Sequence, residues 1–306
     1  MNKENEGINV LSLFDGMSCG MIALERAGIK VKNYYASEID KHAIKVSRYN
    51  YPDIIQLGDV TKVSAENLPK IDLLIGGSPC QGFSMSGRQL NFNDPRSALF
   101  FEYLRLLNEI REVNPEVKFL LENVKMKREH SDLISELLGC EPVMINSKDF
   151  SAQSRTRYYW TNILVRKYEP KKVRLKDICP DASARIDAEA LTNQVRSILQ
   201  TSKYVENFKQ LTGQDGRVMI CRPDGLKIQR IGRIAFSENY TEILTTVTQP
   251  YICSNNEIRK ATPVEAERLQ TVPDNYTSCV SDSQRYKMLG NGWTVDVIAH
   301  ILQGLK

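Results

Sequence analysis

Residues 71–84, with the sequence IDLLIGGSPCQGFS, join a short apolar run to two glycines and a cysteine that follows a proline. A second apolar run, residues 117–124 with the sequence VKFLLENV, ends in a carboxylate. Short apolar runs that end in Gly, Pro or Asn are typical of buried parallel strands, and open α/β sheets bind ligands at the carboxyl ends of such strands. We therefore expect Cys80 and Glu122 to meet at one sheet edge, as nucleophile and proton donor.

Strand and helix patterns alternate on both sides of these two runs. Strands are predicted at residues 8–14, 34–39, 54–57, 72–75 and 119–121, and helices at 23–28, 41–49 and 97–113. This alternation is typical of an α/β fold with a doubly wound, largely parallel sheet. The pattern stops near Leu164 and becomes polar and rich in turns, which indicates a second, smaller unit. Helical patterns return at Thr262, which caps a helix, and near Trp293.

The composition is ordinary for a globular protein, with 42% hydrophobic and 25% charged residues in 306. No apolar run approaches the roughly 20 residues that span a bilayer, and the first residues lack the apolar region of a signal peptide. The seven cysteines have no CxxC spacing, which fits free thiols in a reducing compartment. We therefore expect a cytoplasmic protein. The three histidines lack ligand spacing, so no metal site is predicted.

Positive charge gathers in one part of the chain. Residues 166–260 carry 17 Lys and Arg against 11 Asp and Glu, a local charge of +6 in a chain whose net charge is +4. That asymmetry fits a module that faces a polyanion beside a nearly neutral catalytic body. A solvated surface whose sign has no meaning explains it equally well.

The first predicted turn, residues 14–20 with the sequence FDGMSCG, uses two glycines to bring backbone close to a ligand. It differs from the GxGxxG fingerprint, which disfavours a nicotinamide cofactor. Glu38 ends the second strand, where a carboxylate accepts from ribose hydroxyls. Asp59 follows the third strand, placed to accept from an adenine amino group, while Phe14 and Ile39 sandwich the ring. A nucleoside without a phosphate-binding loop indicates S-adenosylmethionine.

Six short motifs, in order along most of the chain, resemble those of the cytosine-5 DNA methyltransferases. They are Phe14-Asp15-Gly16 with Gly20, Ser78-Pro79-Cys80-Gln81, Glu122-Asn123-Val124, Gln153-Ser154-Arg155-Thr156-Arg157, Arg268-Leu269-Gln270 followed by Pro273, and Gly290-Asn291-Gly292-Trp293. Each motif alone is weak, but six in the family's order are hard to obtain by chance. The first and last are similar to the animal de novo branch, whereas the cysteine motif follows the bacterial pattern, so a bacterial or phage relative of that branch is indicated.

The resemblance implies a Rossmann-like methyltransferase sheet that binds S-adenosylmethionine, with a second, smaller target-recognition domain. Residues 1–165 and 262–306 would form the discontinuous catalytic domain, and residues 166–261 the recognition domain. The substrate would be double-stranded DNA, with the target cytosine flipped out of the stack. The resemblance also allows a cognate restriction endonuclease as a partner, and either a monomer or a homodimer, because the de novo relatives can pair.

The family's mechanism assigns a role to each catalytic motif. Cys80 would add to C6 of cytosine, and Glu122 would hydrogen-bond N3 in the protonated form that a dry pocket favours. Arg157 would donate to the cytosine O2, while Arg155 would hold a loop or a phosphate. The expected cofactor-binding residues are Phe14, Asp15, Gly16, Gly20, Glu38, Ile39, Asp59, Val60, Ser78, Pro79, Leu99, Asn291 and Trp293. The expected DNA-binding residues are Gln81, Ser84, Arg88, Arg230 and Arg233.

Other functions fit the sequence less well. A zinc cytosine deaminase needs HxE with PCxxC, and Cys80 is followed by Gln-Gly-Phe. An amino-directed methyltransferase uses a Pro-Pro-aromatic motif, in which Cys80 would replace the second proline. The tRNA-methylating branch usually carries a Cys-Phe-Thr tripeptide, which this chain lacks. That branch and an inactive DNA-binding homologue stay open as alternatives. The complete set of predicted catalytic and cofactor-binding residues argues against the inactive homologue.

Overall fold

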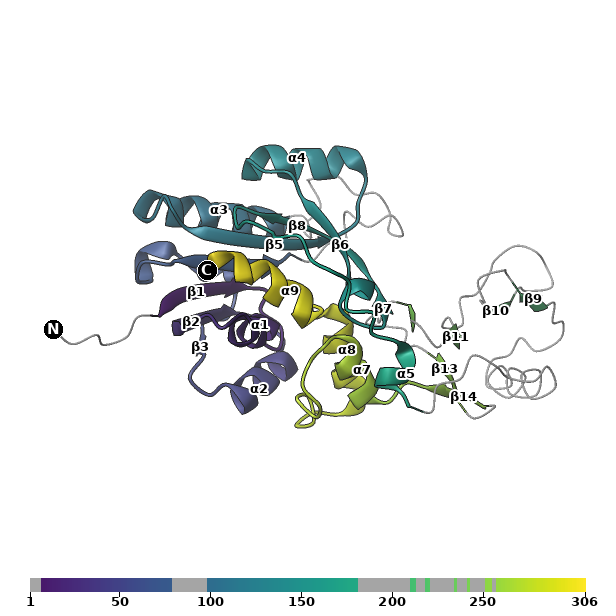
Figure 1. Cartoon of the computed structure of the whole chain (residues 1–306). Helices are drawn as coiled ribbons and strands as arrows, with labels where there is room; N and C mark the ends of the chain where they lie inside the picture. Colours follow the sequence, from purple (N-terminus) through teal and green to yellow (C-terminus); the bar gives the residue numbers. More distant parts are fainter. Residues whose placement is uncertain are drawn as a thin grey trace.

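A seven-stranded sheet forms the centre of the computed structural model, which describes residues 7–78, 98–180, 210–212, 218–220, 234–235, 241–242, 251–254 and 257–306 (Figure 1). Its order is β3-β2-β1-β4-β5-β8-β6. Neighbours from β3 to β5 are parallel, and β8 is antiparallel to both β5 and β6. The strands are β1 (Ile8–Leu13), β2 (Val31–Ser37), β3 (Ile55–Gln56), β4 (Leu73–Gly77), β5 (Lys118–Val124), β6 (Val143–Asn146) and β8 (Thr156–Thr161).

Helices cover both faces of this sheet, as expected for the doubly wound fold (Figure 1). On one face lie α1 (Cys19–Ala27), α2 (Lys41–Asn50) and α9 (Val295–Leu302), and on the other α3 (Ala98–Val113) and α4 (Arg128–Leu138). Successive side chains of β1 point to opposite faces of the sheet, as in any β-strand. Val10 packs with α1, whereas Leu11 and Leu13 pack with α3. The α/β class is therefore confirmed.

The C-terminal segment returns to the first half of the chain. It contains α7 (Pro263–Leu269), α8 (Asp282–Asn291) and α9, and α9 packs on α1. Thr262 caps α7 in a capping box with Glu265, as its sequence predicts. The remaining elements are α5 (Leu175–Ile178), β7 (Gln153–Ser154), β9 (Gln210–Thr212), β10 (Val218–Ile220), β11 (Ile234–Ala235), β12 (Thr241–Glu242), β13 (Tyr251–Ser254), β14 (Glu257–Lys260) and the 3-10 helices η1 (Val60–Lys62), η2 (Ala65–Asn67), η3 (Ser147–Asp149) and η4 (Gln303–Leu305).

The structure differs from the sequence prediction at several boundaries. The strand predicted over residues 34–39 is β2, which begins at Val31 and ends at Ser37, so Glu38 and Ile39 stand in the turn after it. Helices α4 and α8 were not predicted. The sequence of α8 is mostly polar and its helical stripe is weak, whereas α4 carries Leu133, Ile134, Leu137 and Leu138 at helical spacing and its sequence does indicate a helix. In the part of the chain that the structure describes, no helix is both long and apolar enough to cross a bilayer.

A buried carboxylate joins α7 to α8 and leads to a stability prediction. Glu267 is fully buried; its Oε2 accepts from the amide of Asn275 at 2.7 Å, and its Oε1 lies 3.1 Å from Nη2 of Arg285. We expect Glu267→Gln to lower the free energy of unfolding by about 3 kcal/mol, because the buried guanidinium of Arg285 loses its buried charge partner and keeps, among the described residues, only the exposed Asp282 at 3.5 Å. Urea denaturation measures this, with the exposed Glu136→Gln as the control. A loss equal to that of the control would contradict it.

Candidate active site

A cavity of about 460 Å³ opens at the carboxyl ends of the parallel strands. Its wall combines the turn after β1, the turn after β2, the end of β4, the end of β5 and the loop between α8 and α9. The predicted residues that line it are Phe14, Asp15, Gly16, Glu38, Ile39, Asp59, Val60, Ser78, Leu99, Glu122, Arg155, Arg157, Asn291 and Trp293. The structure thus brings eleven of the thirteen expected cofactor-binding residues and three expected catalytic residues to one cavity.

Glu38 organises the turns after β1 and β2. One carboxylate oxygen, Oε2, accepts from the amide of Gly16 at 2.8 Å; the other, Oε1, accepts from the amides of Ile39 at 2.7 Å and Asp40 at 2.8 Å. A carboxylate has about four acceptor positions, so Oε2 keeps capacity for another donor. Phe14 and Gly16 have φ of 56° and 60° in this turn. The arrangement is a backbone cradle with a carboxylate beside it, which suits a nucleoside.

Asp15 lies in the same turn, and its carboxylate is held by neighbouring hydroxyls. It accepts from Tyr34 at 2.7 Å and from Ser18 at 2.5 Å. Burial raises the pKa of Asp15 to about 6, and these hydrogen bonds oppose that rise. The side chain therefore shapes the turn through contacts within the protein.

The raised pKa of Asp15 leads to a prediction for how the stability of the protein depends on pH. Its pKa rises from 3.8 to about 6 on folding, so the folded state binds more protons than the unfolded state between these values. As the pH rises from 4 to 7, wild type should lose about 2 kcal/mol of unfolding free energy relative to Asp15→Asn, because part of the full effect, at 1.36 kcal/mol per pKa unit, already falls below pH 4. Urea denaturation across this range tests it, and the exposed Asp53→Asn should track wild type. Parallel curves for Asp15→Asn and wild type would contradict it.

Two other predicted cofactor residues differ in how they meet the cavity. Asp59 caps η1, where its Oδ1 accepts from the amide of Thr61 at 3.0 Å. The hydrogen bonds that Thr61 donates lower the pKa of Asp59. Gly20 is not among the residues that line the cavity. A Cβ there would lie 2.5 Å from Cδ1 of Ile75 and 2.6 Å from the hydroxyl of Tyr34. Its missing side chain therefore serves the packing of α1 on the sheet.

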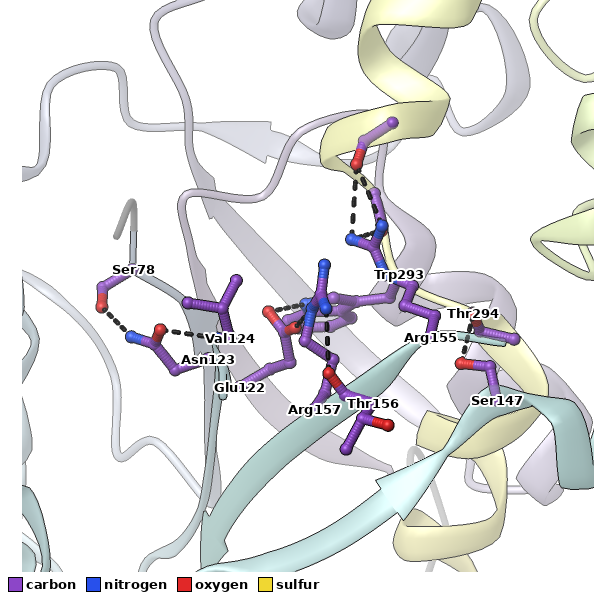
Figure 2. A network of polar contacts seen from close by, with 12 residues as sticks. Ser78, Glu122, Asn123, Val124, Ser147, Arg155, Thr156, Arg157, Trp293 and Thr294 are labelled. Atoms are coloured by element: carbon purple, nitrogen blue, oxygen red, sulfur yellow. Dashed lines mark hydrogen bonds and ion pairs between the residues drawn. The ribbon is translucent and has the colours of Figure 1, made fainter. Parts of the chain in front are cut away.

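Glu122 lies at the end of β5, opposite Gly77 at the end of β4. Its Oε2 accepts from the indole Nε1 of Trp293 at 3.2 Å, and its Oε1 lies 2.9 Å from Nε of Arg157 (Figure 2). The Arg157 contact is a close ion pair, because Nε is not aligned for a hydrogen bond. The dry surroundings expected for Glu122 are only partly realised. Its side chain is buried, but a guanidinium lies against it.

Arg155 contacts the loop between α8 and α9. Its guanidinium is buried; it donates to the carbonyl of Gly290 at 3.3 Å and to that of Gly292 at 3.1 Å. Burial, followed by the nearby charge of Arg157, lowers the pKa of Arg155 to about 9. Arg155 was expected to hold either a loop or a phosphate, and these distances describe a contact with a loop. Arg155 lines the cavity but acts on backbone that leads to Trp293.

Several residues of the site carry no role in the sequence prediction. Gly77 faces both Trp293 and Glu122, and Lys287 pairs with Asp40 at 2.7 Å on the cavity wall. Gln270 donates to the carbonyl of Leu289 at 2.7 Å, behind the same loop. Gln270 was visible inside the Arg-Leu-Gln motif, whereas nothing in the sequence indicates the pairing of Lys287 with Asp40.

Part of the predicted site lies outside the described residues. These are the expected nucleophile Cys80, the expected cofactor residue Pro79, and the expected DNA-binding residues Gln81, Ser84, Arg88, Arg230 and Arg233. The described segment before Pro79 ends at Ser78, whose hydroxyl accepts from the side-chain amide Nδ2 of Asn123 at 3.2 Å. Within the described ranges, no group of three His, Cys, Asp or Glu side chains has the spacing of a metal site.

Comparison with known proteins assigns this geometry to a family. A model described as "C-5 cytosine-specific DNA methylase" matches residues 8–306. The Type II methyltransferase M1.ScrFI of Lactococcus lactis subsp. cremoris is 30% identical over 99% of this chain and 79% of its own length. The Type II methyltransferase M.HhaI of Haemophilus parahaemolyticus is 29% identical over 98% of this chain and 94% of its own. A solved E. coli structure, a putative prophage-encoded DNA modification methyltransferase, shares the fold with a TM-score of 0.68, 22% identity and 98% coverage of both chains.

Proposed function

Because the chain belongs to the C-5 cytosine-specific DNA methylase family, we propose that it methylates C5 of a flipped cytosine through a covalent bond from Cys80. The family resemblance of the six motifs is confirmed, and the enzyme is a DNA cytosine-5 methyltransferase. Beyond family membership, the proposal assigns Cys80 as the nucleophile and Glu122 as the acid, and it states that the target cytosine is flipped out of the duplex. The observation that carries it is the shared cavity, which both Glu122 and the backbone cradle around Glu38 line.

The chain's own residues divide the chemistry as follows. The Cys80 thiolate forms a bond to C6 while Glu122 hydrogen-bonds N3, which stabilises the charge that develops on the ring. C5 then has enamine character and reacts as a nucleophile. Transfer of the C5 proton to a water molecule and elimination of the thiolate from C6 then restore the aromatic ring and the free Cys80. Arg157 would donate to the cytosine O2, and its position beside Glu122, with Nε 2.9 Å from Oε1, supports this role.

The cavity fits S-adenosylmethionine. Glu38 would accept from the ribose hydroxyls, Asp59 from the adenine amino group, and Phe14 and Ile39 would flank the ring. Ile39 is 77% exposed, so its side chain is free to cover a ligand. Trp293 closes the wall toward Glu122. When bound, this cofactor supplies the methyl group as an electrophile at its sulfonium.

DNA is the second substrate of the proposed reaction. Residues 166–261 would form the recognition domain, and Gln81, Ser84, Arg88, Arg230 and Arg233 would contact DNA, on the residue types and the local charge of +6. A base inside a duplex is out of reach, so the target would be flipped. The Type II names of the relatives favour a restriction-modification setting with a cognate endonuclease. The proposal of a cytoplasmic location rests on the cysteine pattern of the sequence.

Bisulfite sequencing tests this function. Plasmid DNA is taken from a host without its own cytosine methylation that expresses either wild type or Cys80→Ala. We expect methylcytosine at one short sequence with wild type and none with the variant. No methylcytosine with either protein, both present and folded, would contradict the proposal. A transfer assay on total tRNA would then test the tRNA-methylating alternative, and a negative result there would leave the inactive homologue.

A further inference from the structure

We infer that Trp293 is a positioning residue that orients Glu122, in addition to lining the cofactor cavity; this inference rests on the proposed role of Glu122. The two residues are 171 positions apart in the chain. Their contact joins the last motif to the acid motif, so the wall of the cofactor cavity reaches the acid directly.

The two carboxylate oxygens of Glu122 have partners of different kinds, a hydrogen-bond donor and an ion-pair partner. Trp293 Nε1 donates to Oε2 at 3.2 Å, and the guanidinium of Arg157 lies at 2.9 Å from Oε1 (Figure 2). An indole N–H is a neutral donor with one direction, so it fixes the rotation of the carboxyl plane without adding charge. A carboxyl held at both oxygens presents a fixed edge to a base, which matters because proton donors act only within hydrogen-bond reach.

The loop that carries Trp293 is itself held. Arg155 donates to the carbonyls of Gly290 and Gly292 on one side. On the other side the hydroxyl of Thr294 donates to Oε1 of Gln270 at 2.8 Å, and Ser147 donates to that hydroxyl at 2.9 Å. Both the residue before Trp293 and the residue after it are therefore fixed by buried polar contacts. An indole on so constrained a backbone can position another side chain.

Gly77 provides the space for this contact. A Cβ at Gly77 would lie 2.9 Å from Nε1 of Trp293 and 3.0 Å from Oε2 of Glu122. Real Cβ contacts of this length require the neighbouring side chains to move. We therefore expect Gly77→Ala to push Trp293 Nε1 and Glu122 Oε2 apart. This substitution disturbs the hydrogen bond but leaves both of its partners unchanged in sequence.

Kinetics of Trp293→Phe provide the first test. The phenyl ring keeps an apolar wall for the cofactor but removes the N–H. We expect kcat to fall about tenfold, while the cofactor Kd measured by calorimetry changes less than about threefold. Gly77→Ala should lower kcat similarly. If Trp293 acts through Glu122, the Trp293→Phe penalty should shrink to less than about twofold in the Glu122→Ala background, measured in single turnovers.

Indole resonances give a readout that does not depend on turnover. The chain has two tryptophans. Trp160 does not line the cavity, and its Nε1 donates to the Ser135 hydroxyl at 3.0 Å. In ¹⁵N-Trp protein without cofactor, Glu122→Gln should move the Nε1–H signal of Trp293 upfield and leave that of Trp160 in place. Gly77→Ala should move the same signal.

The outcomes separate this inference from the function on which it rests. An inactive wild type would overturn the proposed function, while a Trp293 signal that shifts in Glu122→Gln would still support the contact. An active wild type with unchanged kcat in Trp293→Phe would overturn the inference. An equal Trp293→Phe penalty with and without Glu122 would also overturn it, because Trp293 would then act independently. A larger effect on cofactor Kd than on kcat would assign Trp293 to cofactor binding only.

Discussion

Cys80→Ser is expected to abolish methyl transfer, with a loss of roughly 10⁵-fold or more, because removal of a catalytic nucleophile has effects on this scale. The hydroxyl is of similar size to the thiol but is a far weaker nucleophile near neutral pH. Binding of the cofactor should be retained, since Glu38 and its cradle lie on other elements. Transfer of a labelled methyl group to DNA measures the rate, and calorimetry measures cofactor binding.

Cys279→Ser is the matched control. Cys279 is a free, half-buried thiol to which the mechanism assigns no role, so this variant should transfer methyl groups at the wild-type rate. The covalent step also predicts that wild type, but not Cys80→Ser, forms a denaturation-resistant complex with DNA that carries 5-fluorocytosine at the target, because fluorine blocks loss of the C5 substituent. Full activity in Cys80→Ser would exclude Cys80 as the nucleophile.

Glu122→Gln should produce the second large effect, a fall in kcat of about 10²- to 10⁴-fold, which is the usual contribution of a positioned proton donor. The amide keeps the size of the side chain but cannot supply the acid's proton to N3, and it removes the charge that faces Arg157 at 2.9 Å. Cofactor affinity should stay nearly unchanged. The rate is measured in single turnovers, and the Kd by calorimetry.

Glu129→Gln provides the control, because Glu129 is an exposed residue of α4 that undergoes the same chemical change. Thermal unfolding of both variants identifies any general loss of stability. A wild-type kcat in Glu122→Gln would contradict the role of Glu122. A large rise in cofactor Kd with little change in kcat would move Glu122 from the reaction to cofactor binding.

The parallel sheet was predictable because its signals are local. The runs at residues 8–14 and 72–75 are continuous and apolar, as strands buried on both faces must be, and both are strands in the structure. The antiparallel strand β8 and the helices α4 and α8 were not predicted. Helix α4 does carry a helical stripe of apolar residues. The formation of β8 and α8 depends on packing against β5, α7 and the rest of the molecule, and single-sequence periodicity carries little of that information.

The sequence alone determined the family of the protein and which residues were expected in the active site. Six motifs in order identified a cytosine-5 DNA methyltransferase, and strand ends such as Glu38 and Glu122 indicated one sheet edge, because parallel strands deliver their carboxyl ends together. Tertiary structure alone decided which side chains touch. Arg155 holds the loop of Gly290 and Gly292, and Trp293 reaches Glu122 across 171 residues. Such contacts depend on how distant segments pack and on the space left by Gly77, and neither leaves a periodic signal in the chain.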